Sequence, residues 1–513
     1  MKRRIVCGRA FLVAAMTLAL GPAGAAVAGD DRRCAALVST SRPGLEIVSA
    51  TLVPAGSFMA ADQAIQVPAS CRVVGLARPT QDSEIGFELW LPDGWTGRYA
   101  QLGNGGFAGN IDHPSLAAEI RRGNAAAMTD TGHKASQFDA SWALGHPQKV
   151  IDYGYRSIKA TSDAANLLIR RYYDRPPQRR YYIGCSNGGR QALMAAQRYP
   201  DDWDGILSGS PAVQWTRQLA TFAAFQRRLR SRHENWIPHI KLPAIQRAAM
   251  AECAASSLPC RIDVRRLVCR GADGPECLTA DQARSLDLIQ SGTSHFPYGF
   301  DPRFAALRDN WDRWILNRDR SAPSELAFAT QAYRYLILGQ PGWRVEQYDP
   351  KRDNVRASTR MIAGQSLSAI LDADDTNLKR FARHGGKLIM YVGGADAVIL
   401  PGPAIDYYQR LMRNAGASPT RSFARLFVAP GMQHCQGGLA PNAFGQAWVA
   451  PGLDDDPRHD IRLALEAWVE RRHPPTAIVA AKYKDDRIGG AVIATQELLA
   501  YPAPAGAIRA SGP

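Results

Sequence analysis

The sequence predicts an α/β fold, in which a mostly parallel sheet is flanked by helices and interrupted by a large helical insertion. Two apolar runs, Tyr181-Tyr182-Ile183 and residues 388–392, each lead into a glycine-rich turn, as buried strands of a parallel sheet do. A third apolar run, residues 424–428, ends at Pro430-Gly431. Between the first two runs, residues 212–383 are rich in arginine, tryptophan and helix formers and hold few strand-like runs. These observations indicate a parallel core and a helical insertion.

The N-terminus has the pattern of a cleavable export signal. Basic residues precede an apolar run over residues 11–20, and small residues then end at Ala26-Val27-Ala28, before Gly29. An apolar run this short cannot span a bilayer, and no later stretch of about 20 uninterrupted apolar residues follows. We therefore predict that residues 1–28 are a signal peptide and that the mature protein is secreted or periplasmic, without a membrane span.

The charge and the cysteines limit the classes of partner and compartment. The formal net charge is +15, but the basic residues are scattered, and no zinc-finger, RNA-binding or helix-turn-helix signature accompanies them. We expect a solvated basic surface and no nucleic-acid partner; attraction to anionic envelopes or acidic polymers stays open. Of nine cysteines, Cys7 lies in the signal, which leaves an even number suited to an oxidising compartment. Counting alone leaves their pairing open, since eight cysteines allow on the order of a hundred connectivities.

The organisation along the chain is that of one large domain with an insertion. We assign residues 29–211 and 384–513 to the core domain and residues 212–383 to a lid that holds four of the cysteines. Near the C-terminus, apolar residues from Ile461 to Val469 recur at helical spacing, and Pro474-Pro475 ends the pattern. We expect that helix to pack on the sheet.

A serine in a glycine-rich turn carries the sharpest local signal. Gly184-Cys185-Ser186-Asn187-Gly188-Gly189-Arg190 places Ser186 within G-x-S-x-G, after an apolar run and before a helix-forming stretch. That context is the nucleophile elbow of the α/β-hydrolase fold. The serine lies in a strained turn, and side chains at the flanking positions would collide with the adjacent strand and helix. Glycines are therefore needed at these positions. The sequence thus predicts Ser186 as the nucleophile of an α/β-hydrolase.

The base and the acid should follow the nucleophile in the order Ser, acid, His. His434 follows the third apolar run and can take the serine proton, whereas His113, His133 and His146 precede the serine and are interpreted as structural or surface residues. Asp396 directly follows the run that ends at Val392 and is the predicted acid.

Other aspartates lie near the predicted acid in sequence. Asp406 is the fallback acid, although its place inside a probable helix favours a surface role. The cluster of Asp372, Asp374 and Asp375 lacks the glycine and terminal glutamate of a calcium loop. We interpret that cluster as a solvated turn or helix start.

Stabilising the oxyanion requires two backbone donors. One should be the N–H of Asn187, the residue after the nucleophile. The other should come from an early glycine-rich loop, and Gly105 and Gly106, after the apolar run at residues 99–102, are the candidates. The alternative is a plain tight turn. Losing one such donor typically costs about 3 kcal/mol in the transition state.

These residues together resemble the tannase and feruloyl esterase family, which includes mono(2-hydroxyethyl) terephthalate hydrolase. That family has one cysteine directly before the nucleophile bonded to another directly after the catalytic histidine, and Cys185-Ser186 and His434-Cys435 match both halves. The resemblance covers most of the mature chain. It extends through residues 129–133, 188–191, 204–206, 430–432 and 468–470.

The resemblance implies a full set of disulfides and a lid over the substrate. The implied pairs are Cys185 with Cys435, Cys34 with Cys71, Cys253 with Cys260, and Cys269 with Cys277. The family usually carries an acidic calcium loop between two lid cysteines, but the residues between Cys253 and Cys260 include no carboxylate. Because calcium takes six to eight oxygen ligands, several of them charged, we expect no calcium there and no cofactor.

The function that the resemblance implies is hydrolysis of carboxylic esters of aromatic acids, such as galloyl or feruloyl esters, by an acyl-enzyme route. The partner is then a small aromatic ester. The alternative is a secreted, non-catalytic protein that binds a phenolic ligand on the same fold. A metal-dependent hydrolase is disfavoured because the chain has no H-E-x-x-H motif. The sequence does not fix which ester is bound or the oligomeric state.

Overall fold

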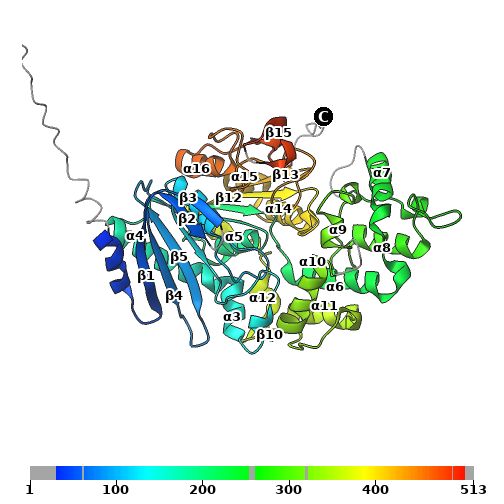
Figure 1. Cartoon of the computed structure of the whole chain (residues 1–513), viewed down its shortest axis with the longest axis horizontal. Coiled ribbons are helices and arrows are strands. Elements are labelled where there is room, and N and C mark those ends of the chain that lie inside the picture. The colour runs from blue at the N-terminus through cyan, green and yellow to red at the C-terminus, as the bar shows by residue number, and fades with distance from the viewer. Residues whose placement is uncertain (1–30, 61–62, 254–259, 318–321, 488, 503–513) are drawn as a thin grey trace, which may run out of the picture.

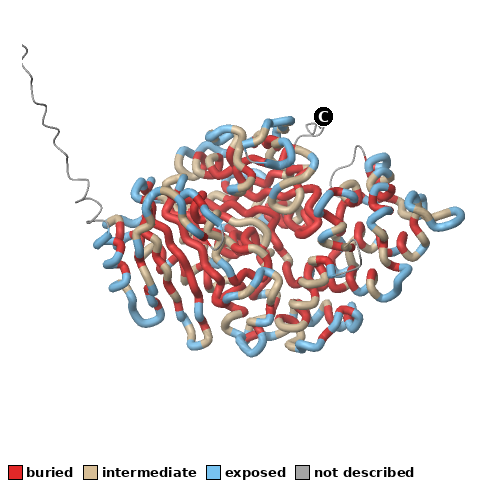
Figure 2. The backbone as a smooth tube through the Cα atoms, viewed as in Figure 1, coloured by how far each residue is buried: buried red, intermediate tan, exposed pale blue. Residues whose placement is uncertain are grey.

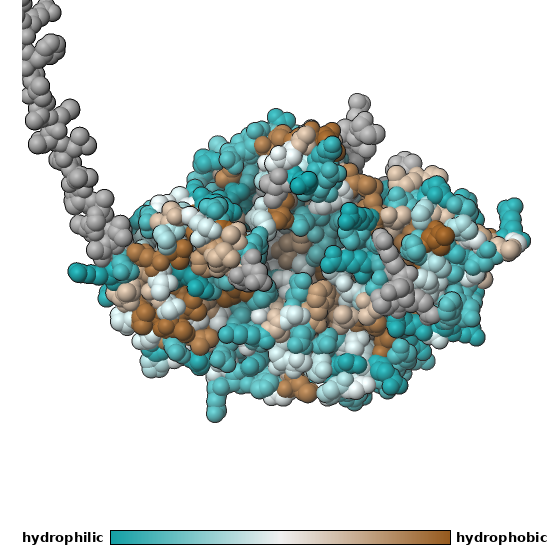
Figure 3. Space-filling view, in the orientation of Figure 1, coloured by the Kyte–Doolittle hydropathy of each residue, from teal (hydrophilic) through white to brown (hydrophobic). Residues whose placement is uncertain are grey.

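Two regions are visible in the structure, a computed structural model that describes residues 31–60, 63–253, 260–317, 322–487 and 489–502 (Figure 1). A large sheet with its helices occupies the left and centre of the view, and a group of helices lies at the right. The predicted signal, residues 1–28, lies outside the described residues. Seen from the same side, the surface is mostly hydrophilic and is hollowed near the middle of the molecule (Figure 3).

The core is a nine-stranded sheet in which antiparallel strands precede parallel ones. Its strands in spatial order are β1 (Leu45–Val53), β4 (Ser70–Ala77), β5 (Ile85–Pro92), β7 (Ala125–Thr129), β6 (Arg98–Leu102), β8 (Arg179–Cys185), β9 (Gly205–Gly209), β12 (Lys387–Gly393) and β13 (Ala424–Ala429). The pairs from β1 to β7 are antiparallel, and all pairs from β7 to β13 are parallel. The predicted α/β-hydrolase fold is confirmed.

Two central strands, β7 and β9, do not stand out in the sequence, because β7 is mostly alanine and β9 has only two large apolar residues between its terminal glycines. β9 lies between β8 and β12, where tyrosine rings fill the space a side chain would take. A Cβ on Gly205 would lie 2.6 Å from the Tyr181 ring, and one on Gly209 would lie 2.1 Å from the Tyr391 ring. Glycine is therefore required at both positions of this strand.

Helices cover both faces of the sheet, and its central strands are mostly buried, whereas the edge strand β1 has exposed positions (Figure 2). One face packs on α4 (Ser157–Tyr173), α5 (Asn187–Arg198) and α14 (Pro401–Ala415), and the other on α2 (His113–Arg121) and α16 (Ile461–Arg471). Smaller elements complete this region: η1 (Ala36–Thr40), η2 (Ser141–Ala143), α3 (Pro147–Ile151), η3 (Asp152–Arg156), α15 (Ala417–Phe423), η10 (Lys484–Asp486), and the hairpins β2 (Gly56–Ala60) with β3 (Gln63–Val67) and β14 (Ala477–Tyr483) with β15 (Val492–Leu499). No helix among the described residues has the length and apolarity that crossing a membrane requires.

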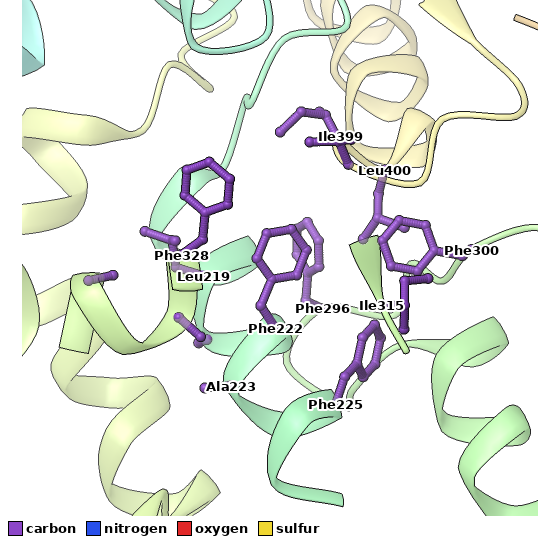
Figure 4. Close-up of a cluster of buried hydrophobic side chains, with 14 of the residues drawn as sticks. Leu219, Phe222, Ala223, Phe225, Phe296, Phe300, Ile315, Phe328, Ile399 and Leu400 are labelled. Carbon is purple, nitrogen blue, oxygen red and sulfur yellow. The ribbon is translucent and has the colours of Figure 1, made fainter. Parts of the chain in front are cut away.

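The lid is a mostly helical insertion between β9 and β12. Its elements are α6 (Trp215–Ser231), η4 (His233–Asn235), η5 (His239–Lys241), α7 (Leu242–Glu252), η6 (Val264–Leu267), α8 (Ala280–Ser291), η7 (Pro302–Phe304), α9 (Trp311–Trp314), α10 (Ser324–Gln331), η8 (Ala332–Ile337), η9 (Val345–Gln347), α11 (Pro350–Thr359), β10 (Met361–Ile362), β11 (Gln365–Ser366), α12 (Leu367–Leu371) and α13 (Lys379–His384). Phenylalanines from α6, α10 and the loops form its core, and Ile399 and Leu400 from the segment after β12 join them (Figure 4). The lid core therefore includes part of the segment that leaves the sheet.

Candidate active site

Ser186 lies in a sharp turn between β8 and α5. Its backbone has φ 65° and ψ −128°, a left-handed conformation that non-glycine residues rarely adopt. The neighbouring glycines are sterically required: a Cβ on Gly184 would lie 2.4 Å from the carbonyl oxygen of Gly188, and one on Gly189 would lie 2.2 Å from that of Gly209. Strain of this kind is typical of functional sites, and this geometry is that of a nucleophile elbow.

His434 and Asp396 are directly hydrogen-bonded. The Nδ1 atom of His434 lies 2.8 Å from Oδ2 of Asp396, whose side chain is buried. The other carboxylate oxygen accepts backbone N–H groups from Val398 at 2.8 Å and Ile399 at 2.9 Å. These bonds fix the carboxylate, which in turn orients the imidazole.

The fallback acid lies elsewhere. Asp406 is on α14, where its carboxylate pairs with Arg410 at 2.9 Å, one helical turn away. The structure therefore brings Asp396, and not Asp406, to His434.

A disulfide connects the turn that carries Ser186 to the loop that carries His434. Cys185 and Cys435 are bonded with their Cα atoms 6.1 Å apart, across 250 positions of sequence. Three further disulfides join Cys34 to Cys71, Cys253 to Cys260 and Cys269 to Cys277. These four pairs are the ones that the family resemblance implied.

The glycine-rich loop after β6 has backbone N–H groups available for an oxyanion. Within the described part of the chain, neither the Gly105 N–H nor the Gly106 N–H donates a hydrogen bond. The carbonyl groups are occupied: Gly105 accepts from the Ala108 N–H at 2.9 Å, and Phe107 accepts from the His133 ring at 2.8 Å. Because the Gly105 and Gly106 N–H groups have no acceptor within the described residues, they are available to an oxyanion.

The earlier histidines have other partners. His113 contacts Glu88 at 3.0 Å, and His146 contacts Asp82 at 2.7 Å. His133 is buried and stacked on Trp142, with ring centroids 3.8 Å apart. Burial lowers the pKa of His133 to about 4, so its ring is neutral at the pH of most natural environments.

The lid reaches the loops that hold His434 and Asp396. The ring centroids of Trp314 and His434 lie 6.4 Å apart in an edge-on arrangement. The side chain of Gln433 donates to the Arg308 carbonyl at 2.9 Å, and Asn310 donates to the Ala395 carbonyl at 2.8 Å. Lid residues therefore border both loops.

The interpretation of the acidic cluster as a solvated turn fits Asp375, which is exposed, but not Asp372. Asp372 joins the two ends of the lid by accepting hydrogen bonds from the N–H and hydroxyl of Thr216 at 2.8 and 2.7 Å. Burial raises the pKa of Asp372 to about 7. The local sequence could not predict this contact, because Thr216 is 156 positions away from Asp372.

Two groups of side chains in the described residues are close enough to share an ion. The first group consists of Cys269, Asp273 and Cys277. Its two cysteines are bonded to each other as a disulfide, so neither offers a thiolate ligand. The second, Asp454, Asp456 and His459, lies on the surface, and His459 already contacts Asp456. The stretch between Cys253 and Cys260, predicted to lack calcium, lies outside the described residues.

Comparison with known proteins places this geometry in a family. The family model "Tannase and feruloyl esterase" matches residues 71–510. An uncharacterized esterase of Xanthomonas campestris pv. campestris is 39% identical over 503 residues, covering 91% of this chain and 87% of that protein. A probable feruloyl esterase B-1 of Aspergillus fumigatus is 26% identical over 86% of each chain. The crystal structure of feruloyl esterase B from Aspergillus oryzae superposes with a TM-score of 0.83 at 25% identity, covering 92% of this chain and 96% of that one. The chain belongs to the tannase and feruloyl esterase family.

Proposed function

We propose that the protein is a secreted serine esterase that hydrolyses carboxylic esters of aromatic, phenolic acids through an acyl-enzyme intermediate. The observation that carries the proposal is the bridge from Cys185 to Cys435, since it places the neighbours of Ser186 and His434 within one covalent link. Family membership supports an ester hydrolase, and the named feruloyl esterases among its relatives support phenolic acyl groups.

The proposed reaction has two steps. The Ser186 hydroxyl oxygen attacks the ester carbonyl carbon while His434 takes its proton, and the oxyanion is held by backbone N–H groups of Asn187 and the Gly105-Gly106 loop. The intermediate collapses to the acyl-enzyme as His434 protonates the leaving alcohol. Water, deprotonated by His434, then attacks the acyl carbon and releases the acid and the free serine. Asp396 keeps the imidazole oriented and stabilises its cation.

The test is kinetic. A panel of gallate, ferulate, coumarate and terephthalate monoesters is compared by kcat/KM with wild-type protein and with Ser186→Ala. We expect turnover of at least one aromatic ester and its loss in the variant, with the melting temperature retained. An undiminished rate in Ser186→Ala would end the assignment of the nucleophile. Binding of these esters without turnover by wild-type protein would favour the non-catalytic alternative.

Two further parts of the proposal concern location and metals. We propose export with cleavage before Gly29, which N-terminal sequencing of the mature protein tests. We also propose that the lid holds no calcium between Cys253 and Cys260, because that stretch offers no carboxylate ligand. Metal analysis finding one tightly bound calcium per chain would contradict this.

A further inference from the structure

A single tyrosine lies between the two parts of the proposed oxyanion hole. Tyr153 is fully buried, and its hydroxyl lies 3.1 Å from the carbonyl oxygen of Gly106 and 3.2 Å from Oδ1 of Asn187. Gly106 belongs to the glycine-rich loop after β6, and Asn187 begins α5 directly after Ser186. Both oxygens lie within hydrogen-bonding distance of the single hydroxyl proton. One side chain thus connects both residues whose N–H groups are proposed to face the oxyanion.

The backbone around Tyr153 is unusual in a way that serves this contact. Residues Asp152–Arg156 form η3, a π-helical turn set between α3 and α4. Such turns insert one residue into a helix and are frequent at functional sites. Gly154 in the same turn allows α12 to approach closely, since a Cβ there would lie 2.6 Å from the Ile370 carbonyl oxygen. The turn is therefore fixed against the end of the lid.

Arg190 contacts both Tyr153 and Asn187. This fully buried guanidinium donates to Oδ1 of Asn187 at 2.7 Å and to the Tyr153 carbonyl at 3.1 Å, and it lies 5.0 Å from the centre of the Tyr153 ring. It also donates to the carbonyls of Gly154 at 3.0 Å and Leu371 at 3.1 Å. Tyr153, Asn187 and Arg190 therefore hold one another in a closed set of contacts.

The chemistry of the hydroxyl suits a permanent donor. Burial raises the pKa of Tyr153, so the phenol keeps its proton at neutral pH. Donors in an oxyanion hole are effective because they are fixed before the reaction, and small displacements weaken them. A group that sets the spacing of two donors acts on the transition state although it does not touch substrate.

We propose that Tyr153 is a positioning residue, a proposal that rests on the proposed function. Tyr153 fixes the Gly106 loop relative to Asn187 and so aligns the two halves of the oxyanion hole. Its loss should weaken stabilisation of the oxyanion and leave ground-state binding of the ester intact. A merely structural tyrosine would instead change the folded fraction and leave the turnover of each folded site unchanged.

The test compares Tyr153→Phe with Tyr408→Phe. Tyr408 on α14 is equally buried and donates to the carbonyl of Ala424 at 3.1 Å, at the start of β13 and so at the opposite end of that strand from the His434 loop. It therefore controls for losing a buried hydroxyl. Active sites are counted by titration with a fluorophosphonate, and kcat and KM are measured for a 4-nitrophenyl ester. Inhibition by phenylboronate, whose tetrahedral serine adduct mimics the intermediate, is the third measurement.

We expect Tyr153→Phe to lower kcat per titrated site by about tenfold to a hundredfold, with KM within about twofold and boronate affinity reduced in parallel with kcat. Tyr408→Phe should keep all three values. An unchanged kcat per titrated site in Tyr153→Phe overturns the inference. If Tyr153→Phe does not fold, Arg190→Lys, which keeps the charge but removes the Nε bond to Asn187, is held to the same criterion. Failure of wild-type protein to titrate or hydrolyse esters would instead refute the proposed function.

Discussion

The sheet and the lid hold their parts of the site by different physical means. Ser186, Asp396 and His434 all follow parallel strands, and their positions are set by backbone geometry, a buried carboxylate and a disulfide that spans 250 positions. The lid borders the site through side chains such as Trp314 on short helices, and its disulfides close loops of 7 and 8 positions. The three proposed reacting groups therefore follow strands of the sheet, whereas the lid contributes side chains that border their loops.

The two regions meet at one segment. Asp396 accepts hydrogen bonds from Val398 and Ile399, and Ile399 and Leu400 pack among the lid phenylalanines (Figure 4). The acid is therefore held from the lid side as well as from β12. Substitutions in residues 398–400 therefore test whether the lid core helps to position Asp396.

The largest expected effect is on the sheet side. Asp396→Asn should lower kcat/KM by about a thousandfold to ten-thousandfold, since an amide cannot stabilise the imidazolium and favours the wrong tautomer. Its side-chain oxygen can still accept the N–H groups of Val398 and Ile399, so the melting temperature should change little. Asp406→Asn, which removes the charge that pairs with Arg410 and Arg413 on α14, is the control. Steady-state kinetics showing equal losses in both variants would contradict the assignment of the acid.

The disulfides of the two regions should differ in their contribution to stability. In the chain-entropy model, a bridge closing 250 positions contributes about 5 kcal/mol and one closing 7 positions about 2.5 kcal/mol. Removing Cys185 and Cys435 by alanine substitution should therefore lower the free energy of unfolding about twice as much as removing Cys253 and Cys260. Denaturant titration of both double variants measures this. Equal losses would mean that the long bridge constrains the unfolded chain no more than the short one.

A pair of leucines tests whether the lid core positions the acid. Leu400→Ala and Leu411→Ala each remove a fully buried leucine, at a cost of about 2–5 kcal/mol, but Leu400 lies in the lid core and Leu411 packs against the sheet. Of the two variants, we expect only Leu400→Ala to lower kcat, by about tenfold, because the loop that carries Asp396 then loses packing against the lid core. Melting curves and kcat per titrated site separate the two effects. Equal kcat values in both variants would show that the lid core has no part in placing the acid.

The last prediction concerns the pH dependence of stability and the buried carboxyl of Asp130, directly after β7. Burial raises the pKa of Asp130 to about 7, outweighing the hydrogen bonds it accepts from the N–H groups of Gly132 and Gly86. Between about pH 4 and pH 7 the folded state then binds more protons than the unfolded state, so this group lowers stability as pH rises, by up to about 1.4 kcal/mol per pH unit. Asp130→Asn should remove that contribution. Unfolding free energies at pH 4.5 and 7 whose difference is the same in wild type and variant would contradict the titration.

The sequence predicted the features that local sterics impose. The elbow at Ser186 could be recognised because Gly184 and Gly189 have no room for a side chain, and Asp396 could be recognised because it directly follows a buried strand. Strands β7 and β9 were not predicted, because β7 is mostly alanine and β9 has only two large apolar residues. The glycines of β9 are explained only by neighbouring rings, such as that of Tyr391 against Gly209.

Contacts between residues far apart in sequence could not be predicted from local patterns. Tyr153 reaches Gly106 and Asn187 across 47 and 34 positions, and Asp372 reaches Thr216 across 156. No motif surrounds Tyr153, whereas Arg190 did fall within a stretch shared with the family. The disulfide pairs came from resemblance alone, because cysteine counts leave connectivity open.

The central claim is that the hydroxyl of Ser186 is activated by His434, and covalent labelling tests it most directly. Wild-type protein is treated with a fluorophosphonate, digested without reduction and mapped by mass spectrometry, beside His434→Ala treated in the same way. The account predicts one phosphonate per chain, on Ser186 within the peptide pair joined by Cys185 and Cys435, and strongly slowed labelling in the variant. Esterase activity that persists with Ser186 unlabelled, or labelling at the same rate without His434, would contradict it.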